Sequence, residues 1–201
     1  MKLFTTTNLL LKHQSELFDQ TINKKITLFH VLELLLVSLV GLAAFGAVMS
    51  LVVPDWWHTL NIMWKMIALI MGSIGLCLPS LYIFSSIRGL RLTLGQLLFF
   101  VLAAVTTIAV VLVSLAPISW FFLWSTDNID IIRVINGVMI GFSLLFGLIL
   151  LARLYAMSKS PFDILVPWLI LVAIVTGQMS HKLAPWYPVN ENTNTNIQQD
   201  L

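Results

Sequence analysis

Apolar segments of 20 or more residues recur along most of the chain, and this feature most restricts how it can fold. As a helix, each segment is long enough to cross a hydrocarbon layer of about 30 Å at a rise of about 1.5 Å per residue. Only 10% of the 201 residues are charged, whereas soluble domains carry about 25%. The chain therefore lacks the polar residues to cover a water-soluble fold, and we expect an all-α integral membrane protein.

The boundaries of the apolar segments predict a bundle of five transmembrane helices. The predicted spans cover residues 26–53, 59–87, 94–124, 131–156 and 162–182. Short connections between them imply that consecutive helices lie antiparallel and adjacent. The third segment is longer than one perpendicular crossing requires, and Pro117 lies where its surplus begins. We predict a kink at Pro117, with the remainder of this segment in the membrane interface.

The distribution of basic residues predicts the orientation of the bundle. Eight lie on the side of the N-terminus, namely Lys2, Lys12, Lys24, Lys25, Arg88, Arg91, Arg153 and Lys159. Three lie towards the other side, namely Lys65, Arg133 and Lys182. Positively charged residues accumulate on the cytoplasmic side of membrane proteins. We therefore expect a cytoplasmic N-terminus and, because five is odd, an external C-terminus.

Two terminal segments flank the predicted transmembrane domain, which covers residues 26–186. Residues 1–25 are expected to form a cytoplasmic amphipathic segment, which either lies on the membrane surface or extends the first helix. Residues 187–201 are rich in Asn, Gln and Thr. Such a composition does not support a folded core, so we expect a flexible polar tail.

Glu33 is the most deeply placed acidic residue, about two turns inside the first span. A carboxylate at this depth needs a partner or a proton, because an unpaired buried charge is costly. The side chains of Arg88 and Arg153 are expected to reach a similar depth in the membrane. A structural ion pair between Glu33 and one of these arginines is therefore the favoured interpretation. The alternative is a small transporter or channel component with a polar path near Glu33, Asn136 and Gln178.

Three cations, Lys65, Arg133 and Lys182, lie towards the predicted outer side of the bundle. Lysine and arginine side chains near the ends of spans commonly extend to the interface, which is the favoured structural interpretation. The functional alternative is a cluster that contacts an anionic lipid headgroup or an acidic partner.

Six of the seven tryptophans also map to the predicted outer ends of spans: Trp56, Trp57, Trp64, Trp120, Trp124 and Trp186. An aromatic belt at the membrane interface accounts for this distribution. Contact of Trp56, Trp57 and Trp120 with lipids or a partner is the alternative.

Several glycines mark possible helix contacts. Gly137 and Gly141 are four residues apart, the spacing of the small-residue packing motif of membrane helices. Gly72 and Gly75 lie in the second span. Close packing within one chain is the favoured interpretation, and contact with another subunit or a second copy is the alternative.

The chain shows none of the sequence signatures of common enzyme sites. It lacks a metal-binding His/Glu pair at helical spacing, a G-x-S-x-G motif and a phosphate-binding loop. A single cysteine, Cys77, excludes an intramolecular disulfide and a thiolate metal site. We predict a protein that is not an enzyme, with no catalytic residue, metal or cofactor and no nucleic-acid partner.

Three segments resemble a poorly characterised bacterial family of polytopic membrane proteins: residues 79–85 (PSLYIFS), 116–122 (APISWFF) and 177–185 (GQMSHKLAP). Members of that family are similar to Yip1-type proteins in having a cytoplasmic N-terminus and about five spans. Near the last segment, members usually carry an aromatic residue and an arginine, where this chain has His181, Lys182 and Ala184. The resemblance implies a multi-pass protein of the bacterial inner membrane without catalytic activity.

Together these features favour a non-enzymatic membrane subunit that acts as a scaffold or adaptor in a membrane assembly. Its expected partners are membrane lipids and either other membrane subunits or further copies of the same chain. The grounds are the scarcity of buried polar residues, the glycines suited to helix packing and the one-sided tryptophans.

Overall fold

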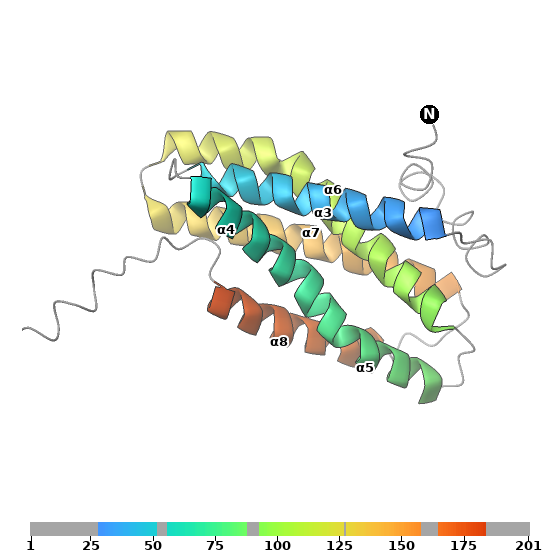
Figure 1. The fold of residues 1–201 in the computed structure, drawn as a ribbon. Coiled ribbons are helices and arrows are strands. Elements are labelled where there is room, and N and C mark those ends of the chain that lie inside the picture. The colour runs from blue at the N-terminus through green and yellow to red at the C-terminus, as the bar shows by residue number, and fades with distance from the viewer. Residues whose placement is uncertain (1–27, 52–55, 88–92, 127, 158–164, 184–201) are drawn as a thin grey trace, which may run out of the picture.

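The computed structural model describes residues 28–51, 56–87, 93–126, 128–157 and 165–183, and every regular element in these ranges is a helix (Figure 1). The elements are α3 (Leu28–Ser50), α4 (Trp56–Ile67), the π-helix η1 (Ala68–Gly72), α5 (Ser73–Ile87), α6 (Leu94–Ser125), α7 (Ile129–Met157) and α8 (Leu165–Leu183). Because α4, η1 and α5 follow one another without a break, they form one long helical segment. The described helices therefore cover the five apolar segments from which the spans were predicted.

Four of these helical segments are long and apolar enough to cross a membrane: Phe29–Ser50, Trp56–Ile87, Leu94–Ser125 and Val134–Arg153. A further apolar stretch within the described residues, Pro167–Ser180, is shorter. For the described part of the chain, the prediction of an all-helical protein with several potential membrane spans is thus confirmed. A fifth crossing, a cytoplasmic N-terminus and an external C-terminus stay predictions. The predicted terminal segments, residues 1–25 and 187–201, lie outside the described residues.

Consecutive helical segments run in alternating directions, so their ends gather at two opposite ends of the bundle (Figure 1). α6 is the central helix, because two thirds of its most apolar window is buried, compared with about a third in the other three spanning segments. It packs against both α3 and α7, while α4 packs against α3. α5 packs mainly against α8. The bundle therefore consists of a larger group around α6 and a smaller pair of α5 and α8.

The start of α6 is fixed by a capping box. The Thr93 hydroxyl accepts a hydrogen bond from the backbone N–H of Gln96, and the Gln96 side chain accepts one from the backbone N–H of Thr93. This reciprocal pair satisfies two donors that a helix start leaves free. At the other end, Pro117 lies inside α6, which stays helical to Ser125. The kink predicted at Pro117 stays a prediction.

The π-helix η1 lies where the second span changes its packing partner. Before it, α4 packs on α3; after it, α5 packs on α8. The Ser73 hydroxyl donates a hydrogen bond to the carbonyl oxygen of Leu69 within this stretch. A π-helical insertion widens the turn and is often found at functional sites. Here it places Leu69 against α8 and near α7.

Three glycines allow neighbouring helices to approach closely. A Cβ atom added at Gly46 would lie 2.9 Å from the Cα of Met63 in α4. At Gly147 it would lie 2.4 Å from a side-chain carbon of Ile108 in α6, and at Gly41 3.1 Å from the Cβ of Ala109. Small residues permit such contacts between membrane helices, where dispersion forces drive association.

Candidate functional site

The structure describes the side chains of two of the three predicted outer cations, Lys65 and Lys182. Lys65 is half-buried in the last turn of α4, and Lys182 is exposed in the last turn of α8. The side chain of Arg133 lies outside the described residues. Convergence of these three cations, and any contact that they make with lipid or a partner, stays a prediction.

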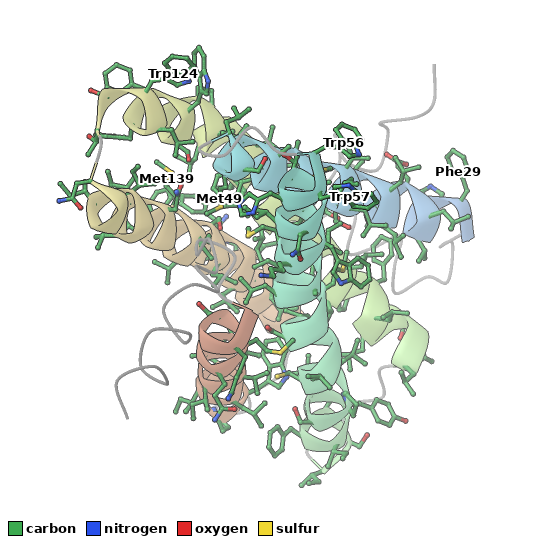
Figure 2. The ribbon with its side chains drawn as sticks, turned by 60° about the vertical axis from the view of Figure 1, so that its left-hand side comes forward. Phe29, Met49, Trp56, Trp57, Trp124 and Met139 are labelled. Atoms are coloured by element: carbon green, nitrogen blue, oxygen red, sulfur yellow. The ribbon has the colours of Figure 1, made fainter. Side chains whose placement is uncertain are left out.

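The described tryptophans other than Trp168 are exposed, including the predicted contact residues Trp56, Trp57 and Trp120. Figure 2 shows Trp56 and Trp124 projecting from the bundle. Trp186 lies outside the described residues. This exposure fits both the aromatic belt and a contact rim, so both interpretations remain.

Glu33 is buried in the second turn of α3, with 8% of its surface exposed. Arg153 is exposed near the end of α7, and Arg88 lies outside the described residues. The predicted ion pair among these residues therefore stays a prediction. Asn136 and Gln178 lie towards the opposite end of the bundle from Glu33, as the directions of α3, α7 and α8 show (Figure 1).

Buried polar side chains in the described bundle connect pairs of helices. The Ser119 hydroxyl of α6 donates a hydrogen bond of 2.7 Å to the Oδ1 atom of Asn136 in α7. The Thr106 hydroxyl of α6 lies 3.1 Å from the carbonyl oxygen of Leu34 in α3. Asn136 is thus engaged between two helices, whereas Gln178, its partner in the predicted polar path, is exposed on α8.

Trp168 makes a contact that sequence reasoning missed. Its side chain is 1% exposed, and its indole N–H donates a hydrogen bond of 2.8 Å to the carbonyl oxygen of Cys77. The same carbonyl accepts a hydrogen bond from the Ser80 hydroxyl. Pro79 lies between these two residues inside α5. A buried indole needs such an acceptor, so this bond fixes the start of α8 on α5.

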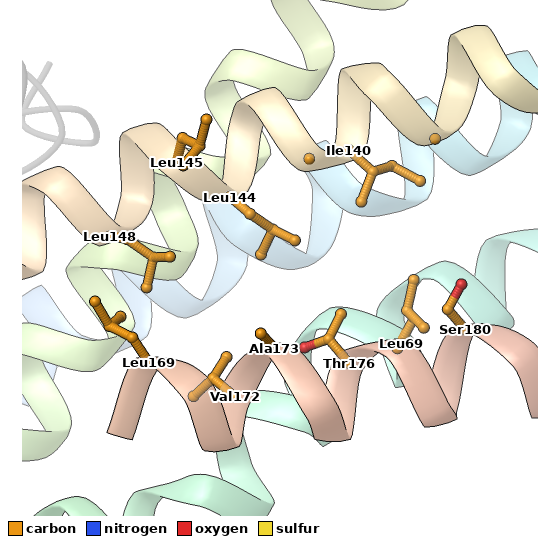
Figure 3. A pocket seen from close by; sticks show the side chains of 13 residues that line it. Leu69, Ile140, Leu144, Leu145, Leu148, Leu169, Val172, Ala173, Thr176 and Ser180 are labelled. Carbon is orange, nitrogen blue, oxygen red and sulfur yellow. The ribbon is translucent and has the colours of Figure 1, made fainter. Parts of the chain in front are cut away.

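A groove of about 330 Å³ runs between α7 and α8 (Figure 3). It exists because α7 packs on α6 and α8 packs on α5 and η1, so that α7 and α8 are not closely packed against each other. The lining residues of α7 are Gly137, Ile140, Gly141, Leu144, Leu145 and Leu148. Those of α8 are Leu169, Val172, Ala173, Thr176, Gly177 and Ser180, and η1 contributes Leu69.

The predicted packing glycines have different surroundings in the structure. Gly72 is close to another helix, because an added Cβ would lie 3.1 Å from the Cε of Met179 in α8. At Gly137, Gly141 and Gly75 an added Cβ would meet no heavy atom within 4 Å. Gly137 and Gly141 instead line the groove. Sequence spacing alone does not distinguish these cases.

Thr176 lies beside the groove and carries a buried hydroxyl that has no hydrogen-bond partner among the described residues. The residue is 9% exposed, and its hydroxyl oxygen makes no hydrogen bond within the described structure. Figure 3 places Thr176 on the side of α8 that faces α7. A threonine hydroxyl in a helix often binds the carbonyl one turn earlier, as Thr106 and Thr107 do here. The Thr176 hydroxyl oxygen has less than 1 Å² of accessible surface, so it is enclosed by the protein and does not face the groove.

Within the described ranges, no group of three or more His, Cys, Asp or Glu side chains is placed to hold a metal ion. The groove itself is lined by apolar side chains, glycines and two hydroxyls, none of them charged. This chemistry suits the binding of an apolar or weakly polar group.

Compared with protein families, with curated proteins and with solved structures, the chain shows no match.

Proposed function

We propose that this protein is a non-enzymatic, multi-pass membrane subunit that acts as a scaffold or adaptor in a membrane assembly. The observation that supports this role is the use of buried polar side chains to hold the bundle together. Ser119 and Asn136 connect α6 to α7, Thr106 connects α6 to α3, and Trp168 connects α8 to α5. Such bonds favour one fixed arrangement of the helices, which a scaffold needs.

A transporter or channel component is the competing proposal. It requires polar groups that face a common path and exchange partners with a solute. Asn136 is 2% exposed and bonded to Ser119, and Gln178 is exposed on α8. Glu33 lies in the second turn of α3, towards the opposite end of the bundle. This placement gives the polar-path proposal less support than the scaffold proposal.

The proposed role includes a location and a set of partners. We place the protein in a bacterial inner membrane, with its N-terminus in the cytoplasm and its C-terminus outside. Its partners are membrane lipids and other membrane subunits or copies of itself. Support comes from the described helices that are apolar enough to span a membrane and from the tryptophans exposed on the bundle.

Two measurements on the full-length protein test this role. In the first, tagged protein is extracted from its native membrane in a mild detergent, and co-purifying proteins are identified by mass spectrometry. A scaffold retains at least one partner at a fixed stoichiometry. A lone monomer without a reproducible partner would contradict the proposal.

The second measurement compares wild-type protein with Glu33→Gln in proteoliposomes loaded with a pH-sensitive dye and, separately, with permeant salts. The scaffold proposal expects no flux above that of empty liposomes for either protein. Flux in the wild type that Glu33→Gln abolishes would instead establish the transporter alternative. The same preparation shows by far-UV circular dichroism that the variant is folded.

A further inference from the structure

The bundle divides into two groups of helices that η1 joins. The pairs α3–α4, α3–α6 and α6–α7 form the larger group, whereas α5 packs mainly on α8 and only slightly on α6. The hydrogen bonds described above follow the same division. Ser119 and Thr106 join helices of the larger group, and Trp168 joins α8 to α5. Each group is therefore held together by bonds of its own.

η1 lies between the two groups, at a point where a helix can bend. α4, which ends at Ile67, belongs to the larger group, and α5, which begins at Ser73, belongs to the smaller pair. Sharp helix kinks, of more than about 20°, are found at π-helical insertions and at few other features. α8 also packs on η1, where Met179 lies close to Gly72. A change of angle at the start of η1 therefore moves α5 and α8 together.

The two helices that face each other across the groove carry matching small residues. α7 contributes Gly137 and Gly141, and α8 contributes Ala173 and Gly177, so that each helix has two small residues four positions apart in the groove lining. At the three glycines an added Cβ would meet no heavy atom within 4 Å. Small residues at this spacing allow membrane helices to pack directly on each other. In this structure the two pairs are not in contact.

The register of α7 and α8 brings these pairs to the same half of the groove. Figure 3 shows Leu148 opposite Leu169 at one end and Ile140 opposite Thr176 towards the other. Because the helices run in opposite directions, the small residues of both lie towards the second end, and leucines line the first. No lining residue is charged. Direct contact between α7 and α8 would therefore enclose no unpaired charge.

The groove is narrow enough to close by a small movement. Its volume of about 330 Å³ extends along α7 from Gly137 to Leu148, a rise of about 16 Å. The mean cross-section is therefore roughly 20 Å², which corresponds to a gap of about 4–5 Å. From Ala68 to Cys77, where Trp168 holds α8, the second span rises about 14 Å. A bend of about 20° at Ala68, within the range of a π-helical kink, moves this point by about 4–5 Å.

We infer that η1 is a hinge on which the α5–α8 pair swings towards α7, until the small residues of α8 meet those of α7 and the groove closes. The structure shows the open position. In the closed position, α7 and α8 gain the direct packing that drives the association of membrane helices. A partner that binds only one of the two positions would shift the balance between them.

This movement goes beyond the proposed scaffold role and does not depend on it. The bonds that support the scaffold role lie within the two groups, so they stay intact when the angle between the groups changes. A rigid bundle can hold a protein partner, and a hinged bundle can lack one. Co-purification therefore tests the role, and a distance measurement within one chain tests the hinge.

Double electron–electron resonance between two nitroxide labels measures the movement. The labels are attached to Phe146→Cys in α7 and Ile174→Cys in α8, which are exposed and lie outside the groove lining. The full-length protein carries Cys77→Ala, is reconstituted in lipid bilayers and is diluted with unlabelled protein, so that only distances within one chain are recorded. The hinge is expected to give two distances that differ by about 4–5 Å.

Further variants in the labelled protein connect the movement to the groove and to η1. Gly141→Leu and Ala173→Leu each fill the groove from one side and should leave only the longer distance. Gly75→Leu is the matched control and should keep both distances, since Gly75 has no neighbour within 4 Å and does not line the groove. Deletion of Ala68 removes the extra residue of the π-helical turn and should leave a single distance. Far-UV circular dichroism shows which variants are folded.

Three results would overturn the inference. One is a single distance in the labelled protein that neither Gly141→Leu nor Ala173→Leu changes, because the groove then does not close. Another is a pair of distances that persists in both of these variants, which would place the movement elsewhere. The third is a pair of distances that persists after deletion of Ala68, which would exclude η1 as the hinge. A single short distance that the two leucine variants lengthen would support closure, with the closed position favoured.

Discussion

Replacing Gly46 by alanine tests the packing of the bundle most sharply. Gly46 lies where α3 and α4 approach, and the Cβ of an alanine would lie 2.9 Å from the Cα of Met63. It would also lie 3.3 Å from the Cγ of Met66 and 3.4 Å from the carbonyl oxygen of Ile62. Two of these three atoms belong to the backbone of α4. The contact therefore cannot be relieved by a side-chain rotation alone, and the helices must separate.

The expected cost follows from this geometry. Non-bonded carbon atoms are most stable at about 3.5–4.0 Å, so α3 and α4 must move apart locally by roughly 0.6–1.1 Å. Overpacking of this kind typically costs about 1–3 kcal/mol. Alanine also has a helix propensity better than that of glycine by about 1 kcal/mol. Gly75→Ala has the same advantage without the contact, because nothing lies within 4 Å of an added Cβ there.

The difference between the two variants therefore isolates the packing term. Unfolding in mixed micelles, in which the fraction of sodium dodecyl sulfate is raised, is followed by tryptophan fluorescence and far-UV circular dichroism. Gly46→Ala is expected to be less stable than Gly75→Ala by about 1–3 kcal/mol. Equal stability of the two variants would refute the close approach of α3 and α4.

Three further substitutions test single interactions. Trp168→Phe removes the hydrogen bond to the carbonyl oxygen of Cys77 and should lower the free energy of unfolding by about 1 kcal/mol; an unchanged transition would argue against this bond. Ser119→Ala leaves the buried Oδ1 of Asn136 without its donor and should cost about 1–3 kcal/mol, which Asn136→Leu in the same chain should partly recover. Thr93→Ala removes the capping hydroxyl of α6. Because such a cap is worth about 1 kcal/mol, amide hydrogen exchange in the first turn of α6 should accelerate roughly fivefold. Unaltered hydrogen exchange would contradict the capping box.

The positions of the helices follow from the sequence because their signal is local. An apolar run long enough to span a bilayer has to satisfy its backbone as a helix, and the polar connections mark where it stops. The predicted third span, residues 94–124, agrees with α6 to within one residue. In the structure, the Thr93 capping box fixes the start of this helix. The last predicted span, residues 162–182, begins three residues before α8. The π-helical stretch within the second span gave no recognisable sequence signal.

The contacts between helices are less predictable, because they depend on which helices become neighbours. Gly137 and Gly141 have the spacing of a packing motif but line an open groove. Gly46 and Gly147, which each have a serine four residues away (Ser50 and Ser143), make close contacts. The difference arises from the packing of α7 on α6 and of α8 on α5. No property of a single helix encodes that arrangement.

Trp168 shows the same limit for polar residues. Along the sequence, a tryptophan near the end of a span is typical of an interfacial anchor, yet this side chain is buried and bonded to Cys77, 91 positions away. Asn136 was predicted to lie on a polar path, and its hydrogen bond to Ser119 became visible only in the structure. The groove and its Thr176 hydroxyl also emerge only once α7 and α8 are placed.

The proposed role requires that a lipid bilayer surrounds the bundle, and a nitroxide spin label at the exposed Gly141 of α7 measures this directly. The label is attached to Gly141→Cys in a Cys77→Ala background, and the protein is reconstituted in lipid bilayers. Electron paramagnetic resonance then compares collisions with oxygen, which concentrates in lipid, and with a water-soluble nickel chelate. We predict high accessibility to oxygen and low accessibility to the chelate. High accessibility to the chelate, or to neither reagent, would contradict a bundle that is embedded in lipid at this position.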